Sequence, residues 1–154
     1  GVLVDRPPVI KLAMTQWAGD GPFAGAAKRA KLVGASFFDV GALPPAKVGD
    51  AYFMRYILHD WPTDQALAIL KNVRSAIGTT GATLLIGECA LPEHNTVGAP
   101  SIMYQIDIQM MVAFGEAQER TPAQWRVLLS ASGFELAAIH PTRSLVHWIE
   151  AKPV

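Results

Sequence analysis

Apolar and polar positions along the 154-residue chain change repeatedly between two periods, which indicates strands that alternate with helices. Short apolar runs bounded by turn residues predict strands at 2–4, 30–38, 51–58, 83–88, 134–140 and 144–151. Apolar residues at helical spacing predict helices after the Pro7-Pro8 pair, over 64–77, around 103–113, and from near Thr121 to Gly133. This order of elements is typical of an α/β domain with a largely parallel sheet.

Two of these segments carry further predictions about the sheet. Residues 51–58 are apolar except for Arg55, so we expect a strand that is buried on both faces. The last two strands are separated by Pro141, Thr142 and Arg143 alone. A link this short joins antiparallel neighbours, which predicts an antiparallel final strand.

Composition narrows the classes of function. The chain is 51% hydrophobic and 17% charged, with 13 basic and 13 acidic residues, so it is globular and has no excess of positive charge. This argues against a nucleic-acid partner and against an anionic membrane surface. No apolar run approaches the roughly 20 residues that span a bilayer. Cys89 is the single cysteine and cannot form an intramolecular disulfide, which favours a reducing, cytoplasmic location.

Polar residues at the carboxyl ends of the predicted strands are the first candidates for a site, because open parallel sheets bind ligands there. They are Asp5, Ser36, His59 and Glu88. An acid at the position of Asp5 can accept hydrogen bonds from both ribose hydroxyls of a nucleotide. The alternative is that Asp5 caps the helix that begins at Pro7.

His59 follows an apolar strand and can act as a general base, since an ordinary histidine is largely neutral near pH 7. A carboxylate at its other ring nitrogen would orient the ring and stabilise the imidazolium ion. Glu88 or Glu119 could supply that carboxylate. The alternative is a structural histidine with two surface acids, and spacing does not show whether the three side chains meet.

Apolar side chains could form the rest of a pocket. Met103 and Met110 lie on one face of a predicted helix, and thioethers adapt to flat aromatic ligands. They could equally form the core of that helix. Cys89 is interpreted as a small buried apolar residue, and Trp61 is the tryptophan best placed to shape a site.

Four sequence blocks resemble one family. They are Phe53–Trp61 (FMRYILHDW), Gly87–Pro92 (GECALP), Glu119–Thr121 (ERT) and Ala131–Phe134 (ASGF). Together they are similar to the plant and fungal small-molecule O-methyltransferases, which include caffeate, flavonoid and acetylserotonin methyltransferases. The blocks follow the order of that family, at about its spacing, over residues 1–154.

The resemblance implies a Rossmann-like class I methyltransferase sheet with a terminal antiparallel hairpin, here lacking the first strand and helix. The family's glycine-rich cofactor loop and its N-terminal dimerisation domain are expected upstream of this chain, in a parent that forms a homodimer. Residues 2–4 and 51–57 would then flank the missing strand and leave unpaired edges. On its own the chain is expected to be inactive.

The resemblance also assigns roles, for a cytoplasmic enzyme of secondary metabolism that uses S-adenosylmethionine and no metal. His59 becomes the general base for a small aromatic hydroxyl substrate, with Glu88 and Glu119 beside it. The implied cofactor-binding residues are Asp5, Ser36, Phe37 and Arg55. The implied substrate-binding residues are Asp60, Trp61, Met103, Asp107 and Met110.

Two positions depart from the family pattern. Ser36 stands where an aspartate is common, and Glu116-Ala117 stands where the family has a glycine-rich turn. Two other functions stay open. One is an inactive methyltransferase-like module used for binding or oligomerisation. The other is a dehydrogenase, which would not explain the joint occurrence of the sequence blocks.

Overall fold

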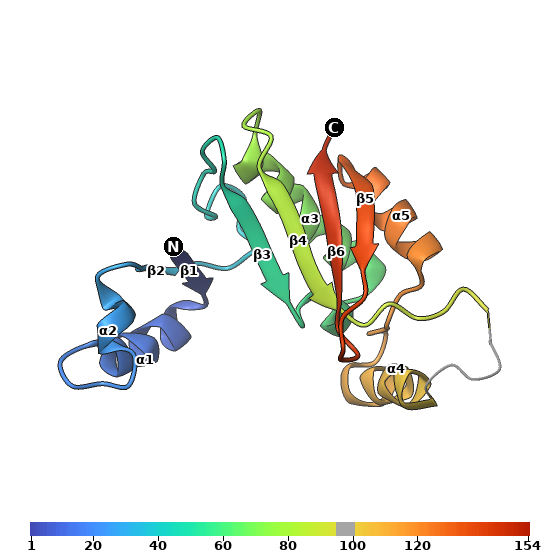
Figure 1. Ribbon diagram of the computed structural model, residues 1–154, viewed down its shortest axis with the longest axis horizontal. Helices are drawn as coiled ribbons and strands as arrows, with labels where there is room; N and C mark the ends of the chain where they lie inside the picture. The colour runs from blue at the N-terminus through green and yellow to red at the C-terminus, as the bar shows by residue number, and fades with distance from the viewer. Residues whose placement is uncertain (95–100) are drawn as a thin grey trace. The chain divides into compact units, whose positions relative to one another are not determined.

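The computed structural model describes residues 1–94 and 101–154, which form two compact units, Gly1–Pro44 and Pro45–Val154. Strands and helices alternate along the chain in both units (Figure 1). This confirms the α/β class that the sequence pattern predicts.

The first unit is a two-stranded parallel sheet with a helical crossover. β1 (Val2–Asp5) pairs with β2 (Lys31–Gly34), and α1 (Pro7–Trp17) and α2 (Ala24–Ala27) connect them. Prolines at the first two positions start α1, where the missing N–H groups cost nothing. Gly34 allows this start to approach the sheet, because a Cβ there would lie 3.1 Å from the Cα of Pro7.

β2 is shorter than the strand predicted at 30–38. The Oγ of Ser36 accepts a hydrogen bond from the N–H of Phe38 at 3.2 Å, and the Ser36 carbonyl accepts one from the N–H of Asp39 at 3.1 Å. These bonds form a turn, so the chain leaves the sheet after Gly34.

The second unit contains a four-stranded sheet in the order β3-β4-β6-β5 (Figure 1). The strands are β3 (Ala51–Arg55), β4 (Thr83–Glu88), β5 (Phe134–His140) and β6 (His147–Pro153). β3 and β4 are parallel, whereas β6 runs antiparallel to β4 and β5. The predicted antiparallel hairpin is therefore confirmed.

The link between β5 and β6 is longer than predicted, and β6 begins at His147 instead of residue 144. The hydroxyl of Thr142 accepts a hydrogen bond from the N–H of Ser144 at 3.0 Å and donates one to the Val146 carbonyl at 2.6 Å. These local bonds hold residues 142–146 in a turn.

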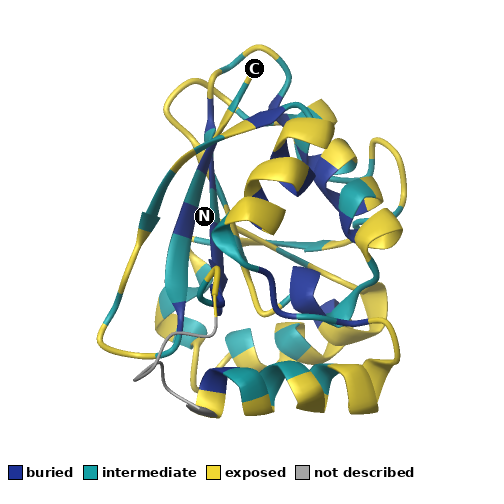
Figure 2. Ribbon diagram, turned by 90° about the vertical axis from the view of Figure 1, so that its right-hand side faces the viewer, coloured by how far each residue is buried: buried dark blue, intermediate teal, exposed yellow. Residues whose placement is uncertain are grey.

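α3 (Thr63–Ile77) and α5 (Pro122–Ala131) lie on the same face of this sheet (Figures 1 and 2). The core consists of fully buried side chains from the helices and the sheet, among them Ile69, Leu70, Ile77, Leu84, Ile86, Trp125, Leu129 and Ile149. α3 ends at Gly78, whose φ of 57° suits a residue without Cβ. Thr121 and Gln124 form a capping box that starts α5.

The prediction that residues 51–58 form a fully buried strand is wrong. β3 stops at Arg55, and Phe53 is 58% exposed. Within the described ranges β3 pairs with β4 alone, so one edge of the strand is open. Residues 58–60 instead form a short 3₁₀ helix, η1 (Leu58–Asp60), which follows the bend at Tyr56.

α4 (Ser101–Phe114) completes the second unit and contacts η1. The predicted apolar face of this helix is only partly buried: Met103 is 6% exposed, whereas Ala113 is exposed. Of the helices in the described residues, none is long and apolar enough to cross a membrane.

Candidate active site

His59 occupies η1, just beyond the carboxyl end of β3. The chain turns there through Tyr56, whose φ of 53° is unusual for a residue with a Cβ. His59 is 8% exposed, and its Nδ1 lies 2.8 Å from Oε1 of Glu119. The turn at Tyr56 thus directs the buried imidazole toward Glu119, whose carboxylate contacts one of the two ring nitrogens.

Glu119 is itself held rigidly. Its side chain is 1% exposed, and its backbone N–H donates to Oδ1 of Asp107 on α4 at 2.8 Å. The N–H of the preceding Gln118 donates to the His59 carbonyl at 3.1 Å. Glu119 therefore reaches His59 from a segment that is tied both to α4 and to η1.

Glu88, the last residue of β4, contacts the same loop in a different way. Its Oε1 accepts hydrogen bonds from the backbone N–H groups of Ile57, Leu58 and His59, at 3.1, 2.6 and 3.3 Å. The structure thus brings His59, Glu88 and Glu119 together. Glu119 is bound to the ring of His59, whereas Glu88 is bound to the backbone that carries the ring.

Burial and the neighbouring acids shift the protonation equilibria of this cluster. Burial raises the pKa of Glu88 to about 7, although the Coulomb attraction of His59 and the backbone hydrogen bonds work in the opposite direction. Burial alone lowers the pKa of His59. The Glu119 hydrogen bond and the charges of Glu88, Glu119 and Asp60 outweigh it, so the pKa of His59 is raised overall.

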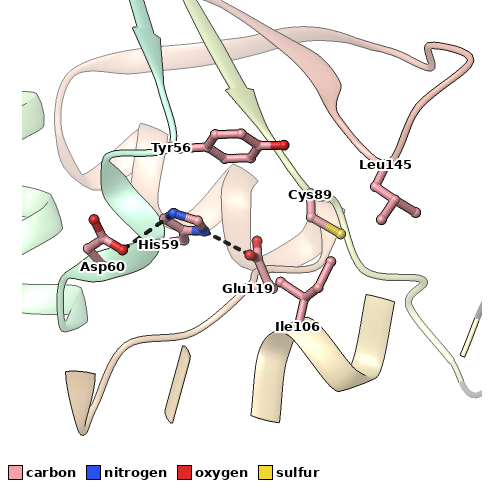
Figure 3. A pocket seen from close by; sticks show the side chains of 7 residues that line it. All are labelled: Tyr56, His59, Asp60, Cys89, Ile106, Glu119 and Leu145. Atoms are coloured by element: carbon pink, nitrogen blue, oxygen red, sulfur yellow. Dashed lines mark hydrogen bonds and ion pairs between the residues drawn. The ribbon is translucent and has the colours of Figure 1, made fainter. Parts of the chain in front are cut away.

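A cavity of about 360 Å³ opens beside His59, within the volume range of small-molecule sites. The Tyr56 ring stacks on the imidazole at a centroid distance of 5.4 Å and an interplanar angle of 16° (Figure 3). Oδ1 of Asp60 lies 3.4 Å from Nε2 of the same imidazole. The cavity is lined by Tyr56, His59, Asp60, Cys89, Ile106, Glu119 and Leu145.

Of the residues predicted to bind substrate, Asp60 lines this cavity and the others are not among its described lining residues. Met103 packs against Cys89 and Leu91, so it belongs to the core beneath α4, as the alternative interpretation of this residue predicts. Asp107 holds the backbone of Glu119, and the carbonyl of Trp61 accepts a hydrogen bond from Arg120. Met110 is half-buried on α4.

Sequence reasoning missed four lining residues. Ile106 lies on the apolar helix face that the spacing predicts, and could have been found from that pattern. Cys89 directly follows Glu88, and burial raises the pKa of its thiol to about 12, so it contributes an apolar wall. Tyr56 depends on a backbone turn and Leu145 on a folded link, and neither leaves a pattern in the sequence.

The predicted cofactor residues of the first unit lie at the carboxyl ends of its two strands. Asp5 is paired with Gly34, and its carbonyl accepts a hydrogen bond from the N–H of Ala35, directly before Ser36 and Phe37. Asp5 does not cap α1: its Oδ1 accepts a hydrogen bond from the N–H of Arg6, which is itself the N-cap residue.

Arg55 belongs to the second unit, where it is exposed at the end of β3. Its guanidinium carbon lies 4.8 Å from the centroid of the Tyr56 ring, on whose plane His59 also stacks. Among residues 1–94 and 101–154, no group of three or more His, Cys, Asp or Glu side chains is arranged to hold a metal ion.

Comparison with known proteins shows a match over most of the chain. A family model described as an O-methyltransferase domain matches residues 1–135. Phenazine O-methyltransferase PhzM from Lysobacter antibioticus is 38% identical over 154 residues, which are 100% of this chain and 41% of that protein. The chain thus spans about two-fifths of the length of this relative.

Solved structures agree. The crystal structure of LaPhzM covers the whole chain with a TM-score of 0.85 and 36% identity, over 42% of its own length. The O-methyltransferase NcsB1 from neocarzinostatin biosynthesis, in complex with S-adenosylmethionine and 2-hydroxy-5-methyl naphthoic acid, gives a TM-score of 0.76. It is 28% identical and covers 100% of this chain and 41% of its own.

Proposed function

Since the chain belongs to the family of O-methyltransferase domains, we propose that its protein transfers a methyl group to a hydroxyl of a small aromatic molecule. S-adenosylmethionine is the proposed methyl donor, and His59 is the proposed general base. The observation that carries this proposal is the buried hydrogen bond of 2.8 Å between Nδ1 of His59 and Glu119, at the wall of a cavity.

This hydrogen bond sets the direction in which a proton can move. When Nδ1 carries the proton that Glu119 accepts, Nε2 is left as the basic nitrogen of a neutral imidazole. Nε2 can then accept a proton from an acceptor hydroxyl, and the resulting imidazolium is stabilised by Glu119 and by Asp60 at 3.4 Å. Both carboxylates thus favour the protonated state of His59 that follows proton transfer.

The methyl donor, when bound, supplies an electrophilic methyl group on a sulfonium, which needs no metal or covalent activation. The residues of this chain then have two tasks. Apolar lining from Cys89, Ile106 and Leu145 suits a flat aromatic acceptor. His59 would take the proton of the acceptor hydroxyl as its oxygen bonds to the methyl carbon, while the carbon–sulfur bond of the sulfonium breaks and leaves a neutral thioether. The naphthoic acid in the NcsB1 complex, which bears a hydroxyl group, is an acceptor-like ligand of the same chemical class.

The residues of the first unit fit the nucleoside part of such a donor. Asp5 presents an exposed carboxylate at the carboxyl end of β1, which can accept hydrogen bonds from two ribose hydroxyls. Phe37 follows the carboxyl end of β2. Its ring packs edge to face against that of Phe38, with the ring centroids 5.0 Å apart. We propose that Asp5 binds the ribose and that Ser36 and Phe37 flank the adenine.

The test of the base is His59→Ala in the complete protein that contains this chain, assayed with labelled S-adenosylmethionine and a panel of hydroxylated aromatic molecules. We expect kcat to fall by about 100-fold or more, the effect of removing a general base. Calorimetry should show unchanged affinity for S-adenosylmethionine. His140→Ala, which removes a half-exposed histidine, is the matched control and should leave kcat unchanged.

Near-normal turnover by His59→Ala would contradict the assigned role. A wild-type protein that binds S-adenosylmethionine but methylates no acceptor would favour the inactive binding module instead.

The test of the cofactor residue is Asp5→Ala. Loss of hydrogen bonds to a charged group should weaken S-adenosylmethionine binding by about 1.5–3 kcal/mol, measured by calorimetry. Asp20→Ala, an exposed acid in the loop after α1, is the control. Equal affinity in the folded Asp5 variant would exclude Asp5 from the binding site.

A further inference from the structure

Arg120 is a buried cation next to Glu119 in the sequence, and it is 2% exposed. Its Nη1 donates to the carbonyl of Leu58 at 2.9 Å, and its Nη2 donates to the carbonyl of Trp61 at 3.1 Å. These two carbonyls stand on either side of His59 and Asp60. One guanidinium therefore fixes both ends of the short segment that carries the imidazole.

The backbone of Arg120 is anchored as well. Its carbonyl accepts a hydrogen bond from the N–H of Leu91 at 3.1 Å, and it forms a parallel bridge with Ala90. Arg120 is thus tied to the chain just beyond β4, the strand that ends at Glu88. Glu88 accepts hydrogen bonds from the N–H groups of Ile57, Leu58 and His59, while Arg120 donates to the Leu58 carbonyl. The peptide group between Leu58 and His59 is therefore bound by opposite charges, at its N–H by Glu88 and at its C=O by Arg120.

The charge of Arg120 is costly, which makes its presence informative. Burial lowers the pKa of its guanidinium, and the negative charges of Glu88 and Glu119 counteract that shift. The face of Trp125 lies 5.6 Å from the guanidinium carbon. An apolar side chain of similar volume would avoid the desolvation cost of a buried cation. The charge is therefore better explained by the geometry that it fixes than by stability alone.

We propose that Arg120 is a positioning residue for His59: its two donors set the spacing of the Leu58 and Trp61 carbonyls and thereby hold the imidazole against Glu119. The proposal rests on the role of His59 as the base. Lysine cannot replace arginine here, because its ammonium is a single point whereas the guanidinium is a planar fork that reaches two acceptors at once.

The test compares Arg120→Lys with Arg74→Lys in the complete protein. Arg74 is a matched control, since it also donates to backbone carbonyls, those of Gly78, Gly133 and Val154. Arg120→Lys should lower kcat by about 10- to 100-fold, the cost of a misplaced catalytic group, with unchanged affinity for S-adenosylmethionine. Arg74→Lys should lower the melting temperature and leave kcat within about twofold. Equal losses of kcat in both variants would overturn the proposal.

A second measurement does not depend on turnover. The ring of His59 is hydrogen-bonded to Glu119 and stacks on Tyr56, and the charges of Glu88, Glu119 and Asp60 act on it. Arg120 is bonded to the Leu58 and Trp61 carbonyls of the segment that carries the ring. In Arg120→Lys the total charge is kept, so NMR titration of ¹⁵N-labelled histidine should show the pKa of His59 moved back toward that of an ordinary histidine. An unchanged titration would refute the positioning role, even if the role of His59 as the base were itself disproved.

If Arg120→Lys does not fold, the wild-type protein supplies the test. The Nη protons of Arg120 should exchange slowly with solvent and show couplings across hydrogen bonds to the carbonyl carbons of Leu58 and Trp61. A guanidinium whose protons exchange rapidly and show no such couplings would contradict the proposal.

Discussion

At each end of the four-stranded sheet an arginine donates to backbone carbonyls, and the two arginines differ in burial and in the segments that they bind. At the amino ends of β4 and β5, Arg74 joins Gly78, Gly133 and Val154 at 2.7, 3.0 and 2.9 Å. This contact closes α3, the start of β5 and the end of β6 onto one another. Arg74 is partly exposed, so water screens its charge.

At the carboxyl ends of β3 and β4, Arg120 is buried together with Glu88 and Glu119. Its carbonyl acceptors belong to the segment that carries His59. Both arginines thus donate to backbone carbonyls. The partly exposed Arg74 joins the ends of helices and strands, whereas the buried Arg120 binds the segment that carries His59. The proposed role of Arg120 predicts that burial and the identity of the held segment distinguish a functional arginine from a structural one.

The largest effect on stability should come from Glu88→Ala. This change leaves three N–H groups of residues 57–59 without the carboxylate that they bind. We expect the free energy of unfolding to fall by about 3–5 kcal/mol, as when one partner of a buried charged network is removed. Urea denaturation measures it. A loss below about 1 kcal/mol would show that the buried Glu88 contacts stabilise the fold no more than the partly exposed Arg74 contacts at the other end of the sheet.

A smaller effect should be a pH dependence of the free energy of unfolding that arises from Glu88, at the end of the sheet that carries His59. The pKa of Glu88 is about 7 in the folded protein, above its ordinary value of 4.5, so the folded state binds more protons between these limits. The free energy of unfolding should therefore fall as pH rises from 4.5 to 7. Glu88→Gln lacks this titration, so between pH 5 and pH 8 it should gain on the order of 2–3 kcal/mol relative to wild type. A pH-independent difference would contradict the assignment.

Truncation at the opposite end should affect stability without affecting chemistry. Arg74→Ala removes three hydrogen bonds to carbonyls that water can partly reach, at a cost of about 1–3 kcal/mol in the free energy of unfolding. Turnover at a temperature where the variant is folded should match wild type. A large loss of kcat would mean that the two ends of the sheet are coupled.

The smallest effect should come from the exposed ion pair between His140 and Glu150, whose atoms lie 2.9 Å apart on β5 and β6. Surface pairs contribute about 0–1 kcal/mol, so Glu150→Gln should change the free energy of unfolding by less than about 0.5 kcal/mol. Thermal and urea unfolding measure it. A loss comparable to that of Glu88→Ala would show that burial does not decide the strength of these contacts.

Apolar runs and turn residues in the sequence predict many of the helices and strands, because the residues at the ends of an element determine where it begins and ends. The apolar run Thr83–Glu88 is β4 from end to end, and Gly78 ends α3 where its φ of 57° requires a glycine. The prediction of a buried β3 is wrong, because the exposure of Phe53 depends on what packs against the faces of the sheet, which the residues of the strand itself do not specify. The turn at Thr142 depends on a side-chain hydroxyl that no periodicity shows.

The site was predictable only through the family resemblance. His59 and Glu119 are 60 residues apart, and nothing in their spacing shows that they lie 2.8 Å from each other. The sequence also left open how Glu88 contributes, because a carboxylate can hold a ring or the backbone that carries it. Arg120 was part of a recognised sequence block, but its contacts with Leu58 and Trp61 exist only after the loop has folded.

The pH dependence of methyl transfer by His59→Ala in the complete protein tests the central claim most directly. If His59 is the general base, wild-type kcat should level off once His59 is neutral. The variant should rise by about tenfold per pH unit, because only the ionised fraction of the acceptor hydroxyl reacts. The gap between the two should therefore close toward high pH. A constant ratio between the two proteins across the pH range, or equal rates at neutral pH, would contradict the account.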